Sequence, residues 1–342
     1  MPLYCGIDLH ARDSVICIID ETERIYLREK IPNRLEVFLS HLNTFTPKPS
    51  IVVESTINWY WLVDGLMDAG FEVTLAHTLG LSMITGAKVK TDKRDAFVLA
   101  RLLRLGAVPK GYIYPKEQRP VRDLLRYRNS LVRRRAAEYG SLWKMLAQYG
   151  IVCPTPDFHR HLTEEQLAEH LDHPVLRKQG AMTIERIHAY TRQIKEIEDT
   201  LLATVKDRPE FNLLQTIPGV GTILALTIYY ETGDIGRFAG PKQFSSYCRV
   251  VPGVAQSGGV SKRGRGSKQG NPHLKWAFCQ AAVLATRFYQ PVRKFRQKHL
   301  QRRKTKGNKL VSLGIVAHKM AVAAFYVLRD RVPFRGELMF QT

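Results

Sequence analysis

The sequence predicts a mixed α/β domain at the N-terminus, followed by a chain that is almost entirely helical. Short runs rich in apolar and β-branched residues, separated by polar turns, lie within the first 76 residues. The segments 117–149 and 178–206 instead have the length and apolar spacing of long helices. We therefore expect three domains: an α/β domain over 1–112, a helical coiled-coil linker over 113–208 and a basic helical domain over 209–342.

The N-terminal elements are expected in a definite order. Three strands at 3–8, 14–20 and 24–31 read as an antiparallel meander. Asn33 is expected to cap an amphipathic helix over 35–42. A buried strand SIVVE at 50–54, a helix over 59–69, a strand over 71–76 and a helix over 92–105 complete the domain. This order matches the mixed sheet of the ribonuclease H-like fold.

The two long helices have distinct surfaces. The first carries seven arginines against little acid, among them Arg126, Arg133 and Arg134, and such a surface suits phosphate contact. In the second, apolar residues recur at spacings of three and four from Ile184 to Val205, which is a heptad-like seam. Such a seam pairs either two chains or two helices of one chain, and the sequence leaves both open.

The third domain opens with two apolar helices around a Pro-Gly-Val-Gly turn, within 213–228. Gly219 and Gly221 allow a tight turn whose backbone N–H groups can face a phosphate, as in the helix-hairpin-helix module that grips DNA backbones. A simple turn between core helices explains the same residues. Residues 252–272 are expected to form a basic Gly- and Ser-rich loop, and 273–289 and 309–328 two apolar helices around a basic run at 293–309.

Nearly all of the net charge of +21 lies in one segment. Residues 235–329 contain 20 Lys and Arg and no Asp or Glu, whereas the rest of the chain has 32 basic and 31 acidic residues. A surface of one sign repels itself, so this segment predicts an anionic partner, and nucleic acid is favoured. The candidate contacts there are Lys262, Arg263, Arg265, Lys268, Lys275, Arg302, Arg303 and Lys304.

Other compartments and partners are disfavoured. No apolar run approaches the ~20 residues that span a bilayer, so we expect no membrane partner. The five cysteines are scattered and never spaced as CxxC, which argues against a disulfide framework or a structural zinc site. The N-terminal residues lack the basic and apolar regions of a signal peptide. We therefore expect a cytoplasmic protein.

Four carboxylates are candidates for chemistry. Asp8 ends the first strand, Glu54 ends the fourth, and Asp92 and Asp95 share one face at the start of a helix. In a ribonuclease H-like sheet the first and fourth strands are neighbours, so Asp8 is expected beside Glu54. Converging carboxylates repel unless cations lie among them, which predicts a two-metal phosphoryl-transfer site for Mg²⁺, with Mn²⁺ as an alternative. Individually, each residue also suits a turn or a helix start.

With these residues the chain resembles a known family, the DEDD transposases of the IS110 group of bacterial insertion sequences, also called bridge-RNA-guided recombinases. The matching motifs are GIDLH, VVEST, KTDKRDAFVLARLL, IPGVG and SGG…SKQGNPHLK, in the same order over nearly the whole chain. The resemblance implies a RuvC-like domain with a DEDD tetrad. It also implies a nucleophilic serine in the Gly-rich loop, which corresponds by position to Ser257, with Ser261 and Ser267 as neighbours.

The resemblance further implies a structured non-coding guide RNA that pairs with double-stranded donor and target DNA, in a nucleoid-associated bacterial protein. Because strand exchange needs several active sites, we expect a homodimer or homotetramer. Lys262, Arg263 and Arg265 are expected to stabilise charge on the phosphorane. The sequence thus predicts an RNA-guided DNA transposase or recombinase.

Two other functions compete with this prediction. The first is a metal-dependent endonuclease similar to Holliday-junction resolvases, which uses the tetrad and water without a serine. The second is a catalytically silent nucleic-acid-binding protein. Ser257→Ala abolishes cleavage only in the recombinase, whereas Asp8→Ala abolishes it in the recombinase and the resolvase.

Overall fold

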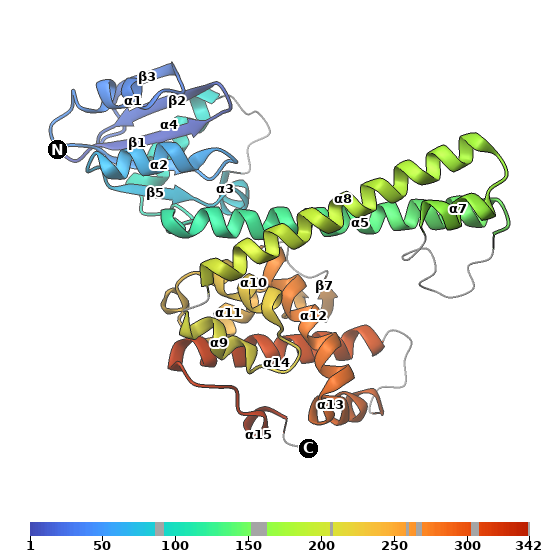
Figure 1. Ribbon diagram of the computed structural model, residues 1–342. Helices are drawn as coiled ribbons and strands as arrows, with labels where there is room; N and C mark the ends of the chain where they lie inside the picture. Colours follow the sequence, from blue (N-terminus) through green and yellow to red (C-terminus); the bar gives the residue numbers. More distant parts are fainter. Residues whose placement is uncertain are drawn as a thin grey trace. The chain divides into compact units, whose positions relative to one another are not determined.

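The computed structural model describes residues 1–85, 92–151, 163–205, 208–257, 260–264, 269–301 and 308–340. The chain divides into two compact units, Met1–Lys116 (unit 1) and Glu117–Thr342 (unit 2). Each unit has buried apolar clusters of its own. Figure 1 labels the helices and strands along the chain.

Unit 1 is built on a five-stranded mixed sheet of order β3-β2-β1-β4-β5. Strands β1 (Tyr4–Leu9), β2 (Asp13–Ile19) and β3 (Ile25–Pro32) form the antiparallel meander that the sequence predicts. Strands β4 (Ser50–Glu54) and β5 (Val73–Ala76) continue the sheet in parallel, with β4 beside β1. This arrangement fits a ribonuclease H-like α/β domain, and the prediction that the first and fourth strands are neighbours is confirmed.

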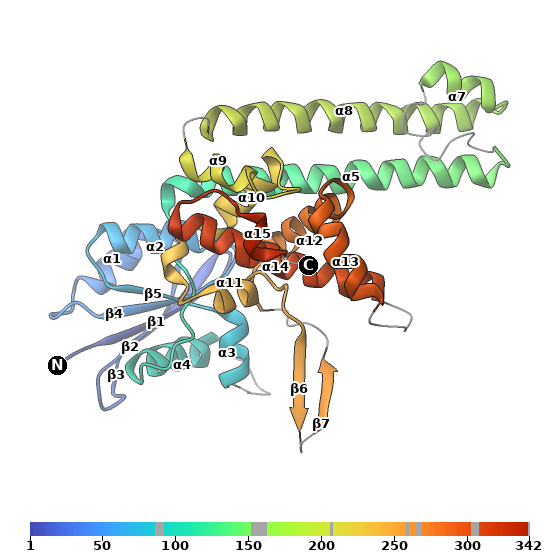
Figure 2. The same ribbon diagram turned by 90° about the horizontal axis from the view of Figure 1, so that it is seen from below.

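Helices cover both faces of this sheet (Figure 2). One face packs against α1 (Leu35–Leu42) and α2 (Trp59–Asp68), and its apolar residues include Ile7 and Val53. The other face packs against α4 (Asp92–Arg104), where Val52 contacts the cluster of Leu99 and Leu102. A further helix, α3 (Thr78–Thr85), follows β5.

Helix α4 lies directly on β1 because Gly6 has no side chain. A Cβ atom added to Gly6 would lie 2.1 Å from the Ala96 carbonyl oxygen and 2.6 Å from the Ala100 nitrogen. At its C-terminus, α4 is held by the Arg104 guanidinium, 2.5 Å from the carboxylate of Glu23 in the β2–β3 turn. That turn adjoins the start of β1, so α4 runs antiparallel to β1 and its first turn lies toward the end of β1.

The helix cap predicted at Asn33 is wrong. Arg34 is the residue that precedes α1, and it makes no side-chain cap bond. The Asn33 side chain instead accepts a hydrogen bond from Ser14 Oγ at 2.6 Å and donates one to the carbonyl oxygen of His10 at 2.7 Å. Asn33 therefore fixes the turn after β1 in place of capping a helix.

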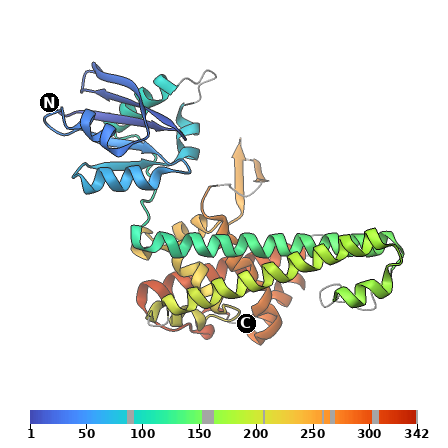
Figure 3. The ribbon, with the colours of Figure 1, turned by 45° about the horizontal axis from the view of Figure 1, so that its top comes forward.

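Unit 2 begins, after the short helix η1 (Lys116–Gln118), with a long helical hairpin (Figure 3). Helices α5 (Arg119–Gln148) and α8 (Pro174–Val205) lie side by side, and the shorter α7 (Glu164–His170) packs on α8. The seam residues Ile184, Ile187 and Leu201 are buried within this chain. Of the two pairings that the seam allows, the structure shows the one inside a single chain.

A helical bundle completes unit 2. Helices α9 (Pro209–Gln215), α10 (Thr222–Thr232), α11 (Pro241–Tyr247), α12 (Pro272–Phe288) and α14 (Asn308–Asp330) enclose a core that contains Phe244, Phe278 and Phe325. The short helix η2 (Ile235–Arg237) follows α10, and α15 (Gly336–Met339) lies near the C-terminus. Helix α13 (Gln290–Gln301) contains the first part of the basic run between the two apolar helices.

The segment predicted as a loop, 252–272, contains a β-hairpin. Strands β6 (Gly253–Ser257) and β7 (Val260–Gly264) pair in antiparallel fashion, with Ser257 opposite Val260. The sequence prediction missed these strands because glycine, serine and lysine dominate the segment and apolar alternation is weak.

One helix corrects the expectation about apolar length. Among the described residues, Lys309–Asp330 of α14 is long and apolar enough to cross a membrane, by length and composition alone. Val316, Met320 and Phe325 of this helix are buried in the core of unit 2. Packing inside the bundle accounts for the apolar composition, since core helices meet the same criteria.

Candidate active site and nucleic-acid interface

The ends of β1 and β4 bring two of the predicted carboxylates to one edge of the sheet. Ile7 pairs with Val53 in parallel register, and Asp8 and Glu54 follow them on the two neighbouring strands. Because side chains alternate along a strand, both carboxylates lie on the face opposite Ile7 and Val53. That is the face that α4 covers.

The carboxylate of Asp8 is buried, with a side chain only 5% exposed. Its Oδ2 lies 3.2 Å from Nε2 of His10, whose ring is about half exposed. A buried carboxylate is costly unless it has polar or charged partners, and here the imidazole is one. Glu54 is half-buried at the end of its strand.

Helix α4 carries the two remaining acids of the predicted tetrad. Asp95 is half-buried and immediately precedes Ala96, which packs on Gly6. Asp92 begins the helix, but its side chain lies outside the described residues. Because α4 runs antiparallel to β1, its first turn lies toward the edge that carries Asp8 and Glu54.

Two asparagines that the sequence did not single out as site residues hold this edge together. The carbonyl oxygen of His10 accepts hydrogen bonds from Nδ2 of Asn33 at 2.7 Å and from Nδ2 of Asn58 at 2.9 Å. Asn58 follows β4, and its Oδ1 accepts a bond from Thr56 Oγ1 at 2.9 Å. One carbonyl therefore joins the loops that follow Asp8 and Glu54.

The candidate nucleophile lies in unit 2, on the β6–β7 hairpin. Ser257 is the last residue of β6. Ser261 lies in β7, where it pairs with Gln256 of β6, and Ser267 lies outside the described residues. Lys262 and Arg263 are in β7, opposite Ala255 and Val254. For this hairpin the structure describes the backbone pairing alone. The remaining candidate cations lie outside the described residues: Arg265, Lys268, Arg302, Arg303 and Lys304.

Two models of known protein families match parts of this chain. A family model of DEDD transposases of the IS110 type, described as "Transposase", matches residues 5–151. A second model, described as "Transposase IS116/IS110/IS902 family", matches residues 211–297. The chain belongs to the IS110 group of DEDD transposases.

Three curated relatives illustrate the range of similarity to this chain. It is 30% identical over 208 residues to the putative transposase y4qE of Sinorhizobium fredii, covering 58% of this chain and 48% of the relative. It is 28% identical to the transposase for insertion sequence element IS1111A of Coxiella burnetii, covering 51% of this chain and 50% of the relative. The pilin gene-inverting protein of Moraxella lacunata is 23% identical over 97% of both chains. The match thus spans about half the length of the first two relatives.

The four residues predicted to form the tetrad are all carboxylates, and such oxygen donors suit a hard divalent cation. Among the described residues, no group of three or more His, Cys, Asp and Glu side chains is close enough to hold a metal ion. Asp8, Glu54 and Asp95 thus share one side of the sheet without closing into a metal cluster, and the side chain of Asp92 is outside that search.

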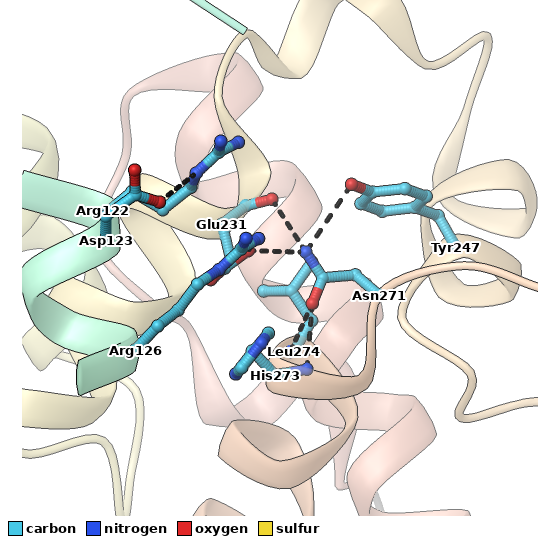
Figure 4. A network of polar contacts seen from close by, with 8 residues as sticks. All are labelled: Arg122, Asp123, Arg126, Glu231, Tyr247, Asn271, His273 and Leu274. Atoms are coloured by element: carbon cyan, nitrogen blue, oxygen red, sulfur yellow. Dashed lines mark hydrogen bonds and ion pairs between the residues drawn. The ribbon is translucent and has the colours of Figure 1, made fainter. Parts of the chain in front are cut away.

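The predicted arginines of α5 differ in their surroundings, and Figure 4 shows those of Arg126. Arg126 makes a bidentate ion pair with Glu231 of α10, at 2.6 Å and 2.8 Å, and the Glu231 side chain is 1% exposed. Arg133 and Arg134 are exposed to solvent. The pair with Glu231 gives Arg126 a structural role that competes with phosphate contact.

The Pro-Gly-Val-Gly turn joins α9 and α10 and has two different glycines. Gly219 has φ of +80°, and an added Cβ atom would lie 2.4 Å from the Ala281 carbonyl oxygen in α12. Gly221 is exposed, precedes α10 and has open space around it. Tight packing therefore explains Gly219, whereas Gly221 leaves the start of α10 accessible, with no side-chain cap.

Exposed cations continue over the bundle of unit 2. Lys275 is exposed on α12, and Arg293, Lys294 and Lys298 are exposed on α13. No acidic residue occurs between 235 and 329 to neutralise them within that segment. These helices therefore present a positively charged surface that suits phosphate backbones.

Proposed function

We propose that this chain is the DNA transposase of an insertion sequence, and that it cuts and rejoins DNA by a serine nucleophile assisted by a metal-binding DEDD tetrad. One observation carries the proposal. Asp8 and Glu54 end adjacent parallel strands on the face of the sheet where α4 begins, in a chain that belongs to a DEDD transposase family.

In this proposal Asp8, Glu54, Asp92 and Asp95 hold Mg²⁺, with Mn²⁺ as an alternative, since both prefer oxygen ligands. When bound, the metal supplies positive charge that polarises the phosphate and favours loss of a proton from the attacking hydroxyl. The buried edge excludes water around Asp8. The bonds from Asn33 and Asn58 to one carbonyl keep the two strand ends in register.

The serine step conserves the energy of the broken bond. Ser257 Oγ attacks the phosphorus of the scissile phosphodiester and loses its proton, while the bond from phosphorus to the leaving sugar oxygen breaks and that oxygen gains a proton. The resulting phosphoserine ester joins protein to DNA. A DNA hydroxyl from another end then attacks the same phosphorus, forms a new phosphodiester and releases the serine. Lys262, Arg263 and Arg265 follow Ser257 closely in the sequence, and in this proposal they stabilise the charge on the phosphorane.

Nucleic-acid binding is assigned to the exposed cations of α12 and α13 and to Arg133 and Arg134 of α5. The accessible start of α10 after Gly221 adds backbone N–H donors suited to a phosphate, as in a helix-hairpin-helix module. These groups contact backbones and carry no sequence readout. In the proposal a structured guide RNA supplies sequence choice by pairing with donor and target DNA, an analogue of other RNA-guided systems.

The names of the relatives support DNA rearrangement. The Coxiella burnetii relative is named as a transposase for an insertion sequence element, and the Moraxella lacunata relative as a pilin gene-inverting protein. For this chain we propose a cytoplasmic, nucleoid-associated protein that acts on double-stranded donor and target DNA. A homodimer or homotetramer supplies the several active sites that strand exchange requires.

A reconstituted recombination reaction tests the proposal. Purified protein, Mg²⁺, the candidate RNA and labelled DNA with the element junction are combined, and cut and rejoined products are measured for wild type, Asp8→Asn and Ser257→Ala. Both variants are expected to give no product, and Ser261→Ala is expected to retain it. Cutting by Ser257→Ala at the wild-type rate would instead support a resolvase-like hydrolase, and binding without cutting by wild type would support a silent binding protein.

A further inference from the structure

Glu231 is a buried acid that the proposed chemistry does not use. It lies in α10, a helix with no other charged residue, and its side chain is almost inaccessible to solvent. Burial alone would raise the pKa of this carboxyl, but the hydrogen bonds and charge of Arg126 and the bond from Asn271 hold the pKa below its ordinary value. The group is therefore a buried carboxylate whose two oxygens are both engaged.

Asn271 connects this carboxylate to the helix that follows the β6–β7 hairpin (Figure 4). Its Nδ2 donates to Glu231 Oε2 at 2.7 Å, and its Oδ1 accepts bonds from the backbone nitrogens of His273 and Leu274 at the start of α12. One side chain thus caps α12 and binds the buried acid at the same time.

The same residue closes the base of the segment that carries Ser257. The backbone nitrogen of Asn271 donates to the Tyr247 carbonyl oxygen at 2.6 Å, and Arg249 Nε donates to the Gln269 carbonyl oxygen at 3.1 Å. Gly270 permits this approach, since an added Cβ atom would lie 2.3 Å from the Tyr247 carbonyl oxygen. The chain therefore leaves the bundle and returns to it at one closed base.

On its other side, Glu231 ties this base to the long helix α5 through the bidentate pair with Arg126. A matched pair exists on the same helix, where Arg128 binds Glu198 of α8. The Arg128–Glu198 pair joins α5 to α8 instead of α10, so it provides an internal comparison.

We propose that Glu231 is a positioning residue that fixes the base of the serine-bearing hairpin, through Asn271 on one side and Arg126 on the other. The inference rests on the proposed function for its effect on cleavage, while its structural part stands apart from catalysis. Asn271 binds both the α12 backbone and Glu231. We therefore expect loss of its bond to Glu231 to loosen the chain where it returns from the hairpin to α12. A displacement of about 1 Å at a reacting group costs on the order of 10²-fold in rate.

Three variants test this inference: Glu231→Gln, Asn271→Ser and, as the matched control, Glu198→Gln. Asn271→Ser keeps a good helix cap but loses the donor to Glu231, so it covers the case in which Glu231→Gln fails to fold. Three quantities are measured in the full-length protein. They are backbone hydrogen exchange over 253–257, 260–264 and 269–274, and the single-turnover cleavage rate at saturating DNA together with the DNA dissociation constant.

The expected result is several-fold faster exchange in the hairpin and a cleavage rate lower by about 10- to 100-fold for Asn271→Ser, with little change in the dissociation constant. Glu198→Gln is expected to match wild type in all three quantities. Hairpin exchange in Asn271→Ser equal to that of wild type would overturn the inference, as would faster exchange with unchanged cleavage. If wild type itself does not cleave, the proposed function fails, and the exchange data alone decide whether Glu231 holds the hairpin.

Discussion

Substitution of Gly6 by alanine is expected to separate the tetrad without altering any acid. The new Cβ atom would lie 2.1 Å from the Ala96 carbonyl oxygen, and real contacts of this kind are about 1 Å longer. The atoms it meets are backbone, so no rotamer change relieves the clash. Helix α4 must therefore move by about 1 Å relative to β1, which carries Asp95 away from Asp8 and Glu54.

The magnitude of the effect follows from two costs. Overpacking of this kind destabilises a core by about 1–3 kcal/mol, which corresponds to a fall of roughly 10 °C in the unfolding midpoint of unit 1. A shift of about 1 Å in a positioned group lowers a catalytic rate by on the order of 10²-fold. The assay is single-turnover DNA cleavage at a temperature where calorimetry shows that the variant is still folded.

Gly65→Ala is the matched control for this substitution. Gly65 lies in α2 on the opposite face of the sheet, where an added Cβ atom would lie 2.4 Å from a terminal methyl group of Leu35. This crowding also destabilises unit 1 but leaves α4 in place, so cleavage by the folded protein is expected to match wild type. A Gly6→Ala protein that is folded and cleaves at the wild-type rate would refute the role of α4 in positioning acids.

Four further predictions follow from the same structure. Asp8→Ala abolishes DNA cleavage without weakening DNA binding, measured by gel shift and cleavage in parallel; residual metal-dependent cleavage would contradict the tetrad. If roughly 8 to 10 phosphates are neutralised per protomer, DNA affinity falls by about four to five orders of magnitude between 50 and 200 mM salt, and a flat titration would argue against the basic surface. Gly219→Ala is expected to destabilise unit 2 by about 3 kcal/mol because of its positive φ and its contact with α12, whereas Gly221→Ala leaves the unfolding free energy nearly unchanged; equal effects in urea unfolding would contradict this assignment. The folded-state pKa of Glu231 lies below its unfolded value of about 4.5, so its contribution to stability is present above that pH and is lost as the pH falls through the folded pKa. The difference in unfolding free energy between wild type and Glu231→Gln should therefore shrink below about pH 4.5. A constant difference would show that ionisation of this group is not linked to folding.

Much of unit 1 could be predicted from the sequence because its signals are local. The short β-branched runs gave the five strands nearly in place, and their order implied that β1 and β4 are neighbours. The placement of Asp8 beside Glu54 followed from that topology alone. The bond from Asn33 to the His10 carbonyl could not be predicted in this way, since an asparagine before a helix looks the same whether it caps the helix or holds a turn.

Long-range pairing limited the prediction for unit 2. The sequence of α5 predicts that Arg126 contacts phosphate because the arginines lie close together and few acids are nearby. Its partner Glu231 is 105 positions away, so the pattern within α5 does not reveal the ion pair. One signal was available, since a single acid within the apolar run of α10 must either face solvent or find a buried cation. The sequence did not predict the β6–β7 hairpin because its strands are short and rich in glycine and polar residues.

The central claim is that Ser257 becomes joined to DNA during cutting. The most direct measurement is to quench a reaction of wild-type protein with Mg²⁺, guide RNA and junction DNA, digest the product with protease and nuclease, and find the nucleotide-bearing peptide by mass spectrometry. We expect a phosphodiester-linked nucleotide on Ser257, absent in Ser257→Ala and in Asp8→Asn. Cut DNA without any nucleotide-bearing peptide, in equal amount for wild type and Ser257→Ala, would contradict the claim and show that water is the nucleophile.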